Sequence, residues 1–247
     1  MTRLLPLLLG FFWLQGTATT AFAPKAQHLL QRSACTTTTI LTAAAVDTSI
    51  AQQIAGCEAI LERAAETKQE DSDAVQQALA DLEKAARAAA KQDKTAASTL
   101  LQNLNGDWRL VFTTGTAKTQ ERFGKVNYFP LKAIQSFSTL QEPMGIENGI
   151  YVGDWVALKF SGTMEFDLIK RRLEFDFDTV ALFDGAWKVP LKAGEAAGLG
   201  AKSGLGSESN VKNAAKGNKA FFNWISANDK IATARGGGGG LALWKRV

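Results

Sequence analysis

The sequence predicts a mainly β protein, a small antiparallel β-barrel preceded by two or three short α-helices. Residues 49–101 have the composition and the apolar spacing of amphipathic helices. From residue 103 onward, apolar and polar residues alternate in eight or nine short segments without an intervening helix. A closed barrel is expected because it removes the edges that such a sheet would otherwise expose.

The N-terminus predicts two targeting segments in series. Arg3, the apolar run 4–14 and the small residues up to Ala21 form the three parts of a signal peptide, and the run is too short to span a bilayer. The acid-free stretch after it has the composition of an organellar transit peptide. We expect a signal peptide at residues 1–21 and a transit segment at 22–46. An ordinary secreted protein with a low-complexity start is the alternative.

Charge and residue usage narrow the function classes. Residues 1–46 hold three of the 28 basic residues and none of the 24 acidic ones, so the rest of the chain is nearly neutral and no nucleic-acid partner is expected. The only histidine, His28, lies in the expected presequence, so the mature chain supplies neither a His-type metal site nor a Ser-His-Asp triad. Cys35 lies there too, which leaves Cys57 as an expected inert thiol without a disulfide partner.

A helical lead-in is expected at residues 47–103. Its apolar residues recur at three- and four-residue spacing, which gives each helix one apolar stripe. Asp71 or Ser72 is a suitable N-cap for the second helix. The stripes consist of Ile50, Ile54, Cys57, Ile60 and Leu61 in the first helix and Val75, Leu79 and Leu82 in the second.

The barrel is expected at residues 104–247. Its clearest alternation runs through 156–168, and a return strand follows at 173–177 with a shift of phase at Asp178-Thr179, which we interpret as a bulge or strand end. Further strands are expected near 126–128, 134–139, 146–152, 220–226, 230–235 and 241–246. The residues expected to line the interior and contact an apolar ligand are Trp108, Leu110, Phe112, Val156, Leu158, Phe160, Met164, Phe166, Phe175 and Phe177.

Two glycine-rich segments are interpreted as connections. Residues 185–217 are dense in Gly, Ala, Ser and Lys and are expected to form a long mobile loop. The run 236–240 lacks the Lys-Ser/Thr ending of a phosphate-binding loop and is expected to be a turn between the last two strands.

A row of carboxylates is the strongest argument for an enzyme. Alternation places this row on the wet face, where the groups are solvated, so catalysis there is not expected. We therefore expect no enzyme, no catalytic residue, no metal and no cofactor. The row consists of Glu165, Asp167, Glu174, Asp176 and Asp178.

Two sequence patterns resemble those of known proteins. The junction 19–27, TTAFAPKAQ, resembles the cleavage motif of bipartite presequences in algae with complex plastids, which implies cleavage after Ala21 and a plastid destination. Residues 104–114, LNGDWRLVFTT, resemble the opening motif of the plastid lipid-associated proteins, or plastid fibrillins, and 221–224 with 229–244 resemble their closing pattern. Residues 129–135 resemble the middle of the family more weakly.

This resemblance implies a lipocalin-like barrel at thylakoids or plastid lipid droplets (plastoglobules) that binds carotenoids, quinones or acyl lipids. Residues 191–216 depart from the family pattern as an insertion, and Lys230 stands where the family often has an acid. In such barrels a base near the last strand covers the first tryptophan, which makes Arg235 and Arg246 the candidates here. The residues expected to close the barrel are Gly106, Asp229, Arg235 and Trp244.

Binding inside the barrel is the leading functional hypothesis. An eight-stranded barrel can hold one small ligand or be filled by its own side chains, and the sequence leaves both open. The alternative is a scaffold with a filled barrel that contacts a membrane surface or a protein partner. In that alternative the contact is made by the helices or by lysines of the glycine-rich segment, namely Lys188, Lys192, Lys202, Lys212, Lys216 and Lys219.

Overall fold

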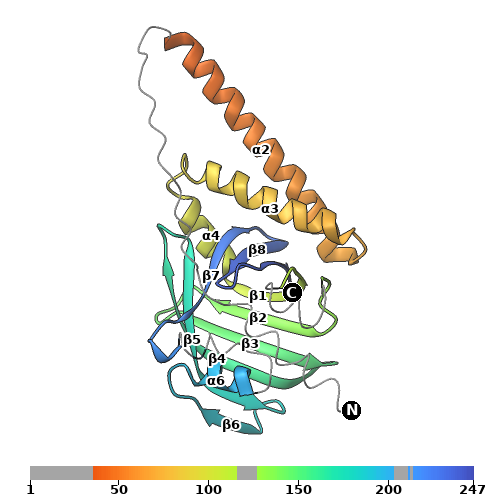
Figure 1. Ribbon diagram of the computed structural model, residues 1–247, viewed down its shortest axis with the longest axis vertical. Helices are drawn as coiled ribbons and strands as arrows, with labels where there is room; N and C mark the ends of the chain where they lie inside the picture. The colour runs from red at the N-terminus through yellow and green to blue at the C-terminus, as the bar shows by residue number, and fades with distance from the viewer. Residues whose placement is uncertain (1–35, 116–126, 203–210, 212–213) are drawn as a thin grey trace.

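The computed structural model describes residues 36–115, 127–202, 211 and 214–247, and it confirms the predicted barrel with its preceding helices (Figure 1). All strands form one antiparallel sheet in the order β4-β3-β2-β1-β9-β8-β7-β5-β6. A β4–β5 pairing closes β1–β5 and β7–β9 into an eight-stranded barrel, and β6 extends β5 beyond β7. The expected signal peptide and residues 22–35 lie outside the described residues.

Apart from β6 and α6, which were not predicted, the described elements follow the predicted order. The helices are α2 (Thr36–Thr67), α3 (Ser72–Ala89), α4 (Ala96–Leu104) and α6 (Glu195–Lys202). The strands are β1 (Gly106–Thr113), β2 (Lys132–Ser138), β3 (Gly145–Val152), β4 (Trp155–Asp167), β5 (Arg172–Leu182), β6 (Trp187–Pro190), β7 (Ala220–Ala227), β8 (Ile231–Gly236) and β9 (Leu241–Arg246). Of the strand expected at 126–128, Tyr128 forms an isolated bridge with Phe112.

The segment 185–217 is more regular than predicted. It contains β6 and α6, so the expectation of one long loop is wrong for this part of the chain. Val189 and Trp187 of β6 pair with β5, and the backbone N–H of Gly194 donates to the Asp176 carboxylate at 3.1 Å. These contacts order a stretch whose small residues alone predict mobility. The expected turn at 236–240 is confirmed, with Gly239 at φ +86°.

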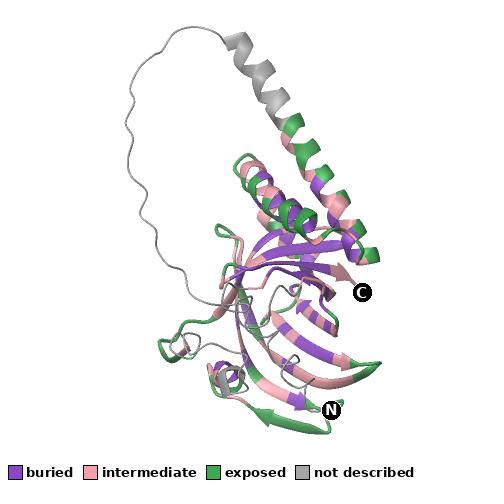
Figure 2. Ribbon diagram, turned by 45° about the vertical axis from the view of Figure 1, so that its right-hand side comes forward, coloured by how far each residue is buried: buried purple, intermediate pink, exposed green. Residues whose placement is uncertain are grey.

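The helices α2 and α3 cover one outer side of the barrel and bury a second core there. Asp71 caps α3 by accepting hydrogen bonds from the backbone N–H groups of Asp73 and Ala74, both at 3.0 Å. Figure 2 shows buried residues concentrated on the strands beneath these helices. The outer core joins Cys57, Leu61, Ala64, Ala65, Val75, Ala78, Leu79 and Leu82 of the helices to Val111, Phe112, Ile225, Ile231, Leu241 and Leu243 of the barrel.

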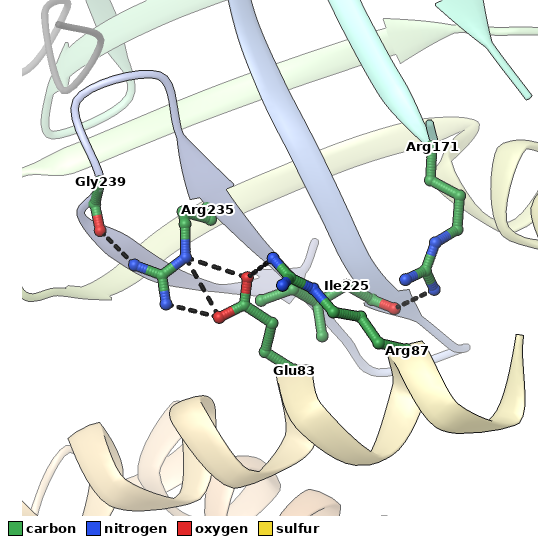
Figure 3. A network of polar contacts seen from close by, with 6 residues as sticks. All are labelled: Glu83, Arg87, Arg171, Ile225, Arg235 and Gly239. Atoms are coloured by element: carbon green, nitrogen blue, oxygen red, sulfur yellow. Dashed lines mark hydrogen bonds and ion pairs between the residues drawn. The ribbon is translucent and has the colours of Figure 1, made fainter. Parts of the chain in front are cut away.

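A charged cluster fastens α3 to the barrel (Figure 3). Arg235 of β8 donates from Nε to both carboxylate oxygens of Glu83, at 2.9 and 3.1 Å, and from Nη2 to one of them. Arg87 of α3 donates to the same carboxylate at 2.8 Å. Burial opposes ionisation of Glu83, but the hydrogen bonds and charges of the two arginines hold its pKa below the usual range.

Glu83→Gln is expected to lower the free energy of unfolding at neutral pH by about 2 kcal/mol, because both arginines lose a buried anionic partner. Because the pKa of Glu83 is depressed in the folded protein, its contribution is present above the unfolded glutamate pKa of about 4.3 and is lost as the pH falls through the folded value. Urea unfolding at neutral and acid pH measures both effects.

Glu70→Gln is the control for this prediction, since it removes an exposed pair with Arg63 and is expected to cost less than about 1 kcal/mol. Equal losses for the two variants would show that the Glu83 cluster does not fasten the helix.

Candidate ligand-binding interior

The barrel interior is lined by the residues that one face of the sheet contributes. Cross-strand partners lie on the same face of the sheet, so the strand pairing identifies the inner-face residues from one strand to the next. The structure places eight of the ten expected lining residues there: Trp108, Leu110, Phe160, Met164, Phe175 and Phe177 within the inner core, and Leu158 and Phe166 packed against it.

Two expected lining residues lie elsewhere because bulges change the phase of their strands. In β1, Leu110 pairs with Trp244 and Phe112 with Leu243, so Val111 is an extra residue and Phe112 turns to the helix-covered outer face. In β4, Leu158 pairs with Ile150 and Val156 with Tyr151, so an extra residue puts Val156 on the outer face. The interpretation of both as interior residues is wrong.

The phase shift expected at Asp178-Thr179 is a bulge in β5. Thr179 pairs with Ser161 and Phe177 with Gly162, which leaves Asp178 without a partner in β4. Phe177 and Val180 therefore both face the interior, three positions apart. An added Cβ at Gly162 would lie 1.9 Å from the backbone oxygen of Asp176, so the bulge requires glycine opposite it.

One end of the barrel is closed, and we call this end the floor. Trp108 is fully buried, and its indole N–H donates to the Leu104 carbonyl at the end of α4, at 2.8 Å. The Arg246 guanidinium lies 4.1 Å from the centre of the Trp108 ring. Gly106 has φ +118°, a conformation that favours glycine, and its backbone lies close to Arg246. A Cβ added to Gly106 would lie 3.1 Å from Nη1 of Arg246.

The base that covers Trp108 is therefore Arg246. The expectation that Arg235 closes the barrel is wrong, because its side chain lies on the outside and binds Glu83 of α3. Arg246 also donates to four backbone carbonyls, those of Asn103, Asn105, Asn228 and Asp229. The exposed Asp229 thus contributes to closure through its backbone. Trp244, also expected in closure, is buried in the inner core.

Aromatic side chains fill the part of the interior formed by β5, β7 and β9. Successive ring centroids of Phe175, Phe222, Trp224 and Trp244 lie 5.3 to 5.8 Å apart. Phe137 of β2 contacts Trp224 edge-on at 5.4 Å and links this cluster to the opposite wall.

The opposite end of the barrel carries exposed apolar residues, and we call this end the mouth. The inner face reaches the mouth through a chain of cross-strand partners. Ala133 pairs with Ile150, Ile150 with Leu158, Leu158 with Leu182, and Leu182 with Trp187 of β6. Figure 1 shows β6 at the end of the molecule away from α2–α4, and Figure 2 shows it exposed along its length. The exposed inner-face side chains of the mouth are Val152, Trp155, Leu182, Trp187 and Val189, with Trp155 and Trp187 each 69% exposed.

Four polar atoms inside the barrel have no hydrogen-bond partner among the described residues. They are Oε1 of Gln135, Oδ1 of Asn148 and Nε1 of Trp224 and Trp244. Gln135 and Asn148 are direct cross-strand partners, and each lies between two apolar residues of the inner core along its strand. They are 3% and 5% exposed, so bulk water does not satisfy them.

Sequence reasoning missed this polar group, although its signal is present. Gln135 falls on the apolar phase of β2 between Ala133 and Phe137, and Asn148 falls on that of β3 between Ile146 and Ile150. A polar residue on an apolar phase is the pattern that identifies such a group. The exposed Trp155 and Trp187 were missed too, because exposure depends on where each strand leaves the barrel.

The carboxylate row lies on the outer face, as alternation predicts. Its residues are engaged locally: Glu165 pairs with Lys219 at 2.6 Å, and Asp167 accepts from the backbone N–H groups of Ile169 and Lys170. Lys219 lowers the pKa of Glu165, and the Lys170 backbone and side chain, with the Ile169 N–H, lower that of Asp167. The lowered pKa values favour the ionised form of Glu165 and Asp167 at neutral pH.

The described residues contain no group of three or more His, Cys, Asp or Glu placed to hold a metal ion. Cys57 is a buried free thiol in the outer core; burial raises its pKa, and the charges of Asp81 and Glu58 raise it further. Within the same part of the chain, no helix is both long and apolar enough to span a membrane.

The interior thus combines an aromatic lining, a closed floor, an apolar mouth and a small set of unpaired polar atoms. An apolar lining with a few polar groups is typical of sites that bind small molecules. In comparisons with known proteins, no protein-family model matches the chain and no curated protein matches it.

Proposed function

We propose that this protein binds an apolar plastid metabolite or lipid in its barrel and does so at the surface of a plastid membrane or lipid droplet. The observation that carries the proposal is the continuity of the apolar inner face from the closed floor to the exposed mouth. Interior burial of an apolar molecule is favoured by about 25 cal/mol for each Å² removed from water. The resemblance of residues 104–114 and 221–244 to plastid lipid-associated proteins supports the class of ligand and the plastid location.

The binding half of the proposal is tested by extracting the purified full chain and analysing the extract for pigment, quinone and acyl lipid. A bound apolar molecule at close to one per chain is expected. A protein that contains none, and that takes up none from solution, would favour the scaffold with a filled barrel. The packed aromatic cluster around Phe222 and Trp224 is the observation that makes the scaffold the second candidate.

The mouth is the proposed contact with the lipid surface. Tryptophan concentrates where apolar lipid meets water, and Trp155 and Trp187 stand exposed on two neighbouring hairpins. Phe183, 60% exposed, lies at the turn of the second hairpin. Lys188 of β6 and Lys192, two residues after this strand ends, are exposed and form no ion pair among the described residues.

The Trp155→Ser/Trp187→Ser double variant is expected to bind vesicles at least about tenfold more weakly than the unmodified protein, because two large apolar side chains no longer enter the lipid. Its free energy of unfolding is expected to change little, since both side chains are exposed. Co-sedimentation with phosphatidylcholine vesicles, with and without phosphatidylglycerol, measures the effect.

The matched control is Leu140→Ser/Ile169→Ser, which removes side chains that are 73% and 96% exposed at the floor end. Vesicle binding by this control is expected to equal that of the unmodified protein. If both double variants lose binding equally, the mouth is not the contact surface. Release by high salt alone would assign the attachment to the lysines in place of the tryptophans.

A further inference from the structure

We propose that the ligand of the barrel is a neutral molecule with a hydroxyl group at one end, which Gln135 and Asn148 bind deep in the interior while the apolar remainder points to the mouth. This inference rests on the proposed function and specifies the chemical class of its ligand.

The first step is the pairing of the two amides. Gln135 and Asn148 face each other across β2 and β3, and their unpaired oxygens accept hydrogen bonds only. A buried polar atom without a partner is unfavourable, so a ligand group that donates a hydrogen bond is stabilised here. An O–H group meets this requirement, whereas an ester or a quinone carbonyl does not.

The second step is the presence of donors in the same interior. The indole N–H groups of Trp224 and Trp244 are unpaired, and the two rings lie 5.3 Å apart. These groups require an acceptor, which a hydroxyl oxygen also supplies. A hydroxyl is the smallest neutral group that both donates and accepts.

The third step concerns charge. Among the described residues, the register places one ionised side chain on the inner face, Arg246, and backbone carbonyls and the Trp108 ring already hold its guanidinium. A carboxylate or phosphate end would therefore be buried without a counter-charge, which is strongly unfavourable. A neutral end group is favoured over an anionic one.

The fourth step is the orientation of the ligand. Gln135 pairs with Trp108 of the floor. Along β2 and β3, the next inner-face pair toward the mouth is Ala133 with Ile150, so the pair Gln135 and Asn148 lies deeper in the barrel. A molecule that enters at the mouth thus meets the amides with its leading end. Its apolar tail is then surrounded by Ile150, Leu158 and the exposed residues of the mouth.

Three probes with the same polyene chain test the end group: retinol, retinyl acetate and retinoate. Binding to the full chain is followed by quenching of tryptophan fluorescence. Retinol is expected to bind about tenfold more tightly than retinyl acetate, and retinoate is expected to bind most weakly. In Gln135→Leu/Asn148→Leu this preference is expected to disappear, so that retinol and retinyl acetate bind equally.

The double variant is expected to fold, because replacing unpaired buried polar groups by leucine leaves no further group unsatisfied. The single variant Asn148→Leu gives an intermediate preference and provides a second readout. The control is Gln141→Leu/Asn218→Leu, which changes the same residue types at exposed positions and is expected to keep the preference for retinol.

The outcomes separate the inference from the proposed function. Equal binding of all three probes by the unmodified protein would overturn the inference and leave the apolar ligand in place. Tightest binding of retinoate would also overturn it. Binding of none of the probes, with no lipid in the extract of the purified chain, would overturn the proposed function itself.

Discussion

Gly162→Ala is expected to destabilise the barrel by more than about 3 kcal/mol, a large part of the stability of a typical domain. The added Cβ would lie 1.9 Å from the Asp176 carbonyl oxygen and 2.8 Å from the Phe177 Cα. Both are backbone atoms in the bulged strand that closes the barrel, so no rotation of a side chain relieves the clash. Urea unfolding followed by tryptophan fluorescence measures the loss.

Gly56→Ala is the matched control for this substitution. Gly56 lies within α2, and nothing is within 4 Å of its added Cβ. Alanine there is expected to raise stability by about 0.5–1 kcal/mol through helix propensity. A Gly162→Ala protein that unfolds within about 1 kcal/mol of the unmodified one would show that β5 does not approach β4 as closely as described.

The sequence predicted the fold because alternation and turn residues are local signals. The bounds of β3, β7 and β9 agree with the predicted strands to within one residue, and the parity change near Asp178 correctly indicated the bulge in β5. That bulge was visible because apolar residues continue on the new phase, at Val180 and Leu182. A bulge can be predicted from the sequence where apolar residues continue on the shifted phase after it.

The bulges at Val111 and Ala157 left no comparable signal. Phe112 and Val156 are apolar and continue the alternation of their strands, yet both lie on the outer face. At Phe112 the outer face is itself apolar because α2 and α3 cover it, so an apolar residue fits either side. Alternation identifies the inner face only where the outer one meets water.

The candidate site was predictable in its apolar part, and Gln135 and Asn148 each stand out on the apolar phase of a strand, but their pairing was not predictable. The lining residues follow from alternation, but the pairing of Gln135 with Asn148 requires the register of β2 and β3, which turn geometry determines. Which of Arg235 and Arg246 covers Trp108 also depends on the strand pairing. Arg235 sits on an outer position of β8, where Glu83 of α3 is available to it.

The two ends of the barrel differ in whether other parts of the chain cover them. At the floor, Arg246 and the end of α4 bind carbonyls and cover Trp108, whereas the mouth leaves tryptophans and aliphatic residues exposed. Entry of the proposed ligand is therefore expected at the mouth, and the floor is expected to contribute stability.

Arg246→Ala is expected to lower the free energy of unfolding by about 3 kcal/mol while Lys245→Ala changes it by less than about 1 kcal/mol. Arg246 donates to four backbone carbonyls that join the end of α4 to the β7–β8 turn, and its guanidinium lies over the Trp108 ring. Its removal leaves partly buried carbonyls without a donor.

Lys245 is the adjacent base on the same strand and forms an exposed ion pair with Glu66. The comparison therefore separates the role of the floor from the loss of a positive charge on β9. Urea unfolding gives both free energies, and hydrogen exchange at residues 103–108 is expected to accelerate in Arg246→Ala only. Equal effects of the two substitutions would mean that the charge of β9, and not closure of the floor over Trp108, stabilises this end of the barrel.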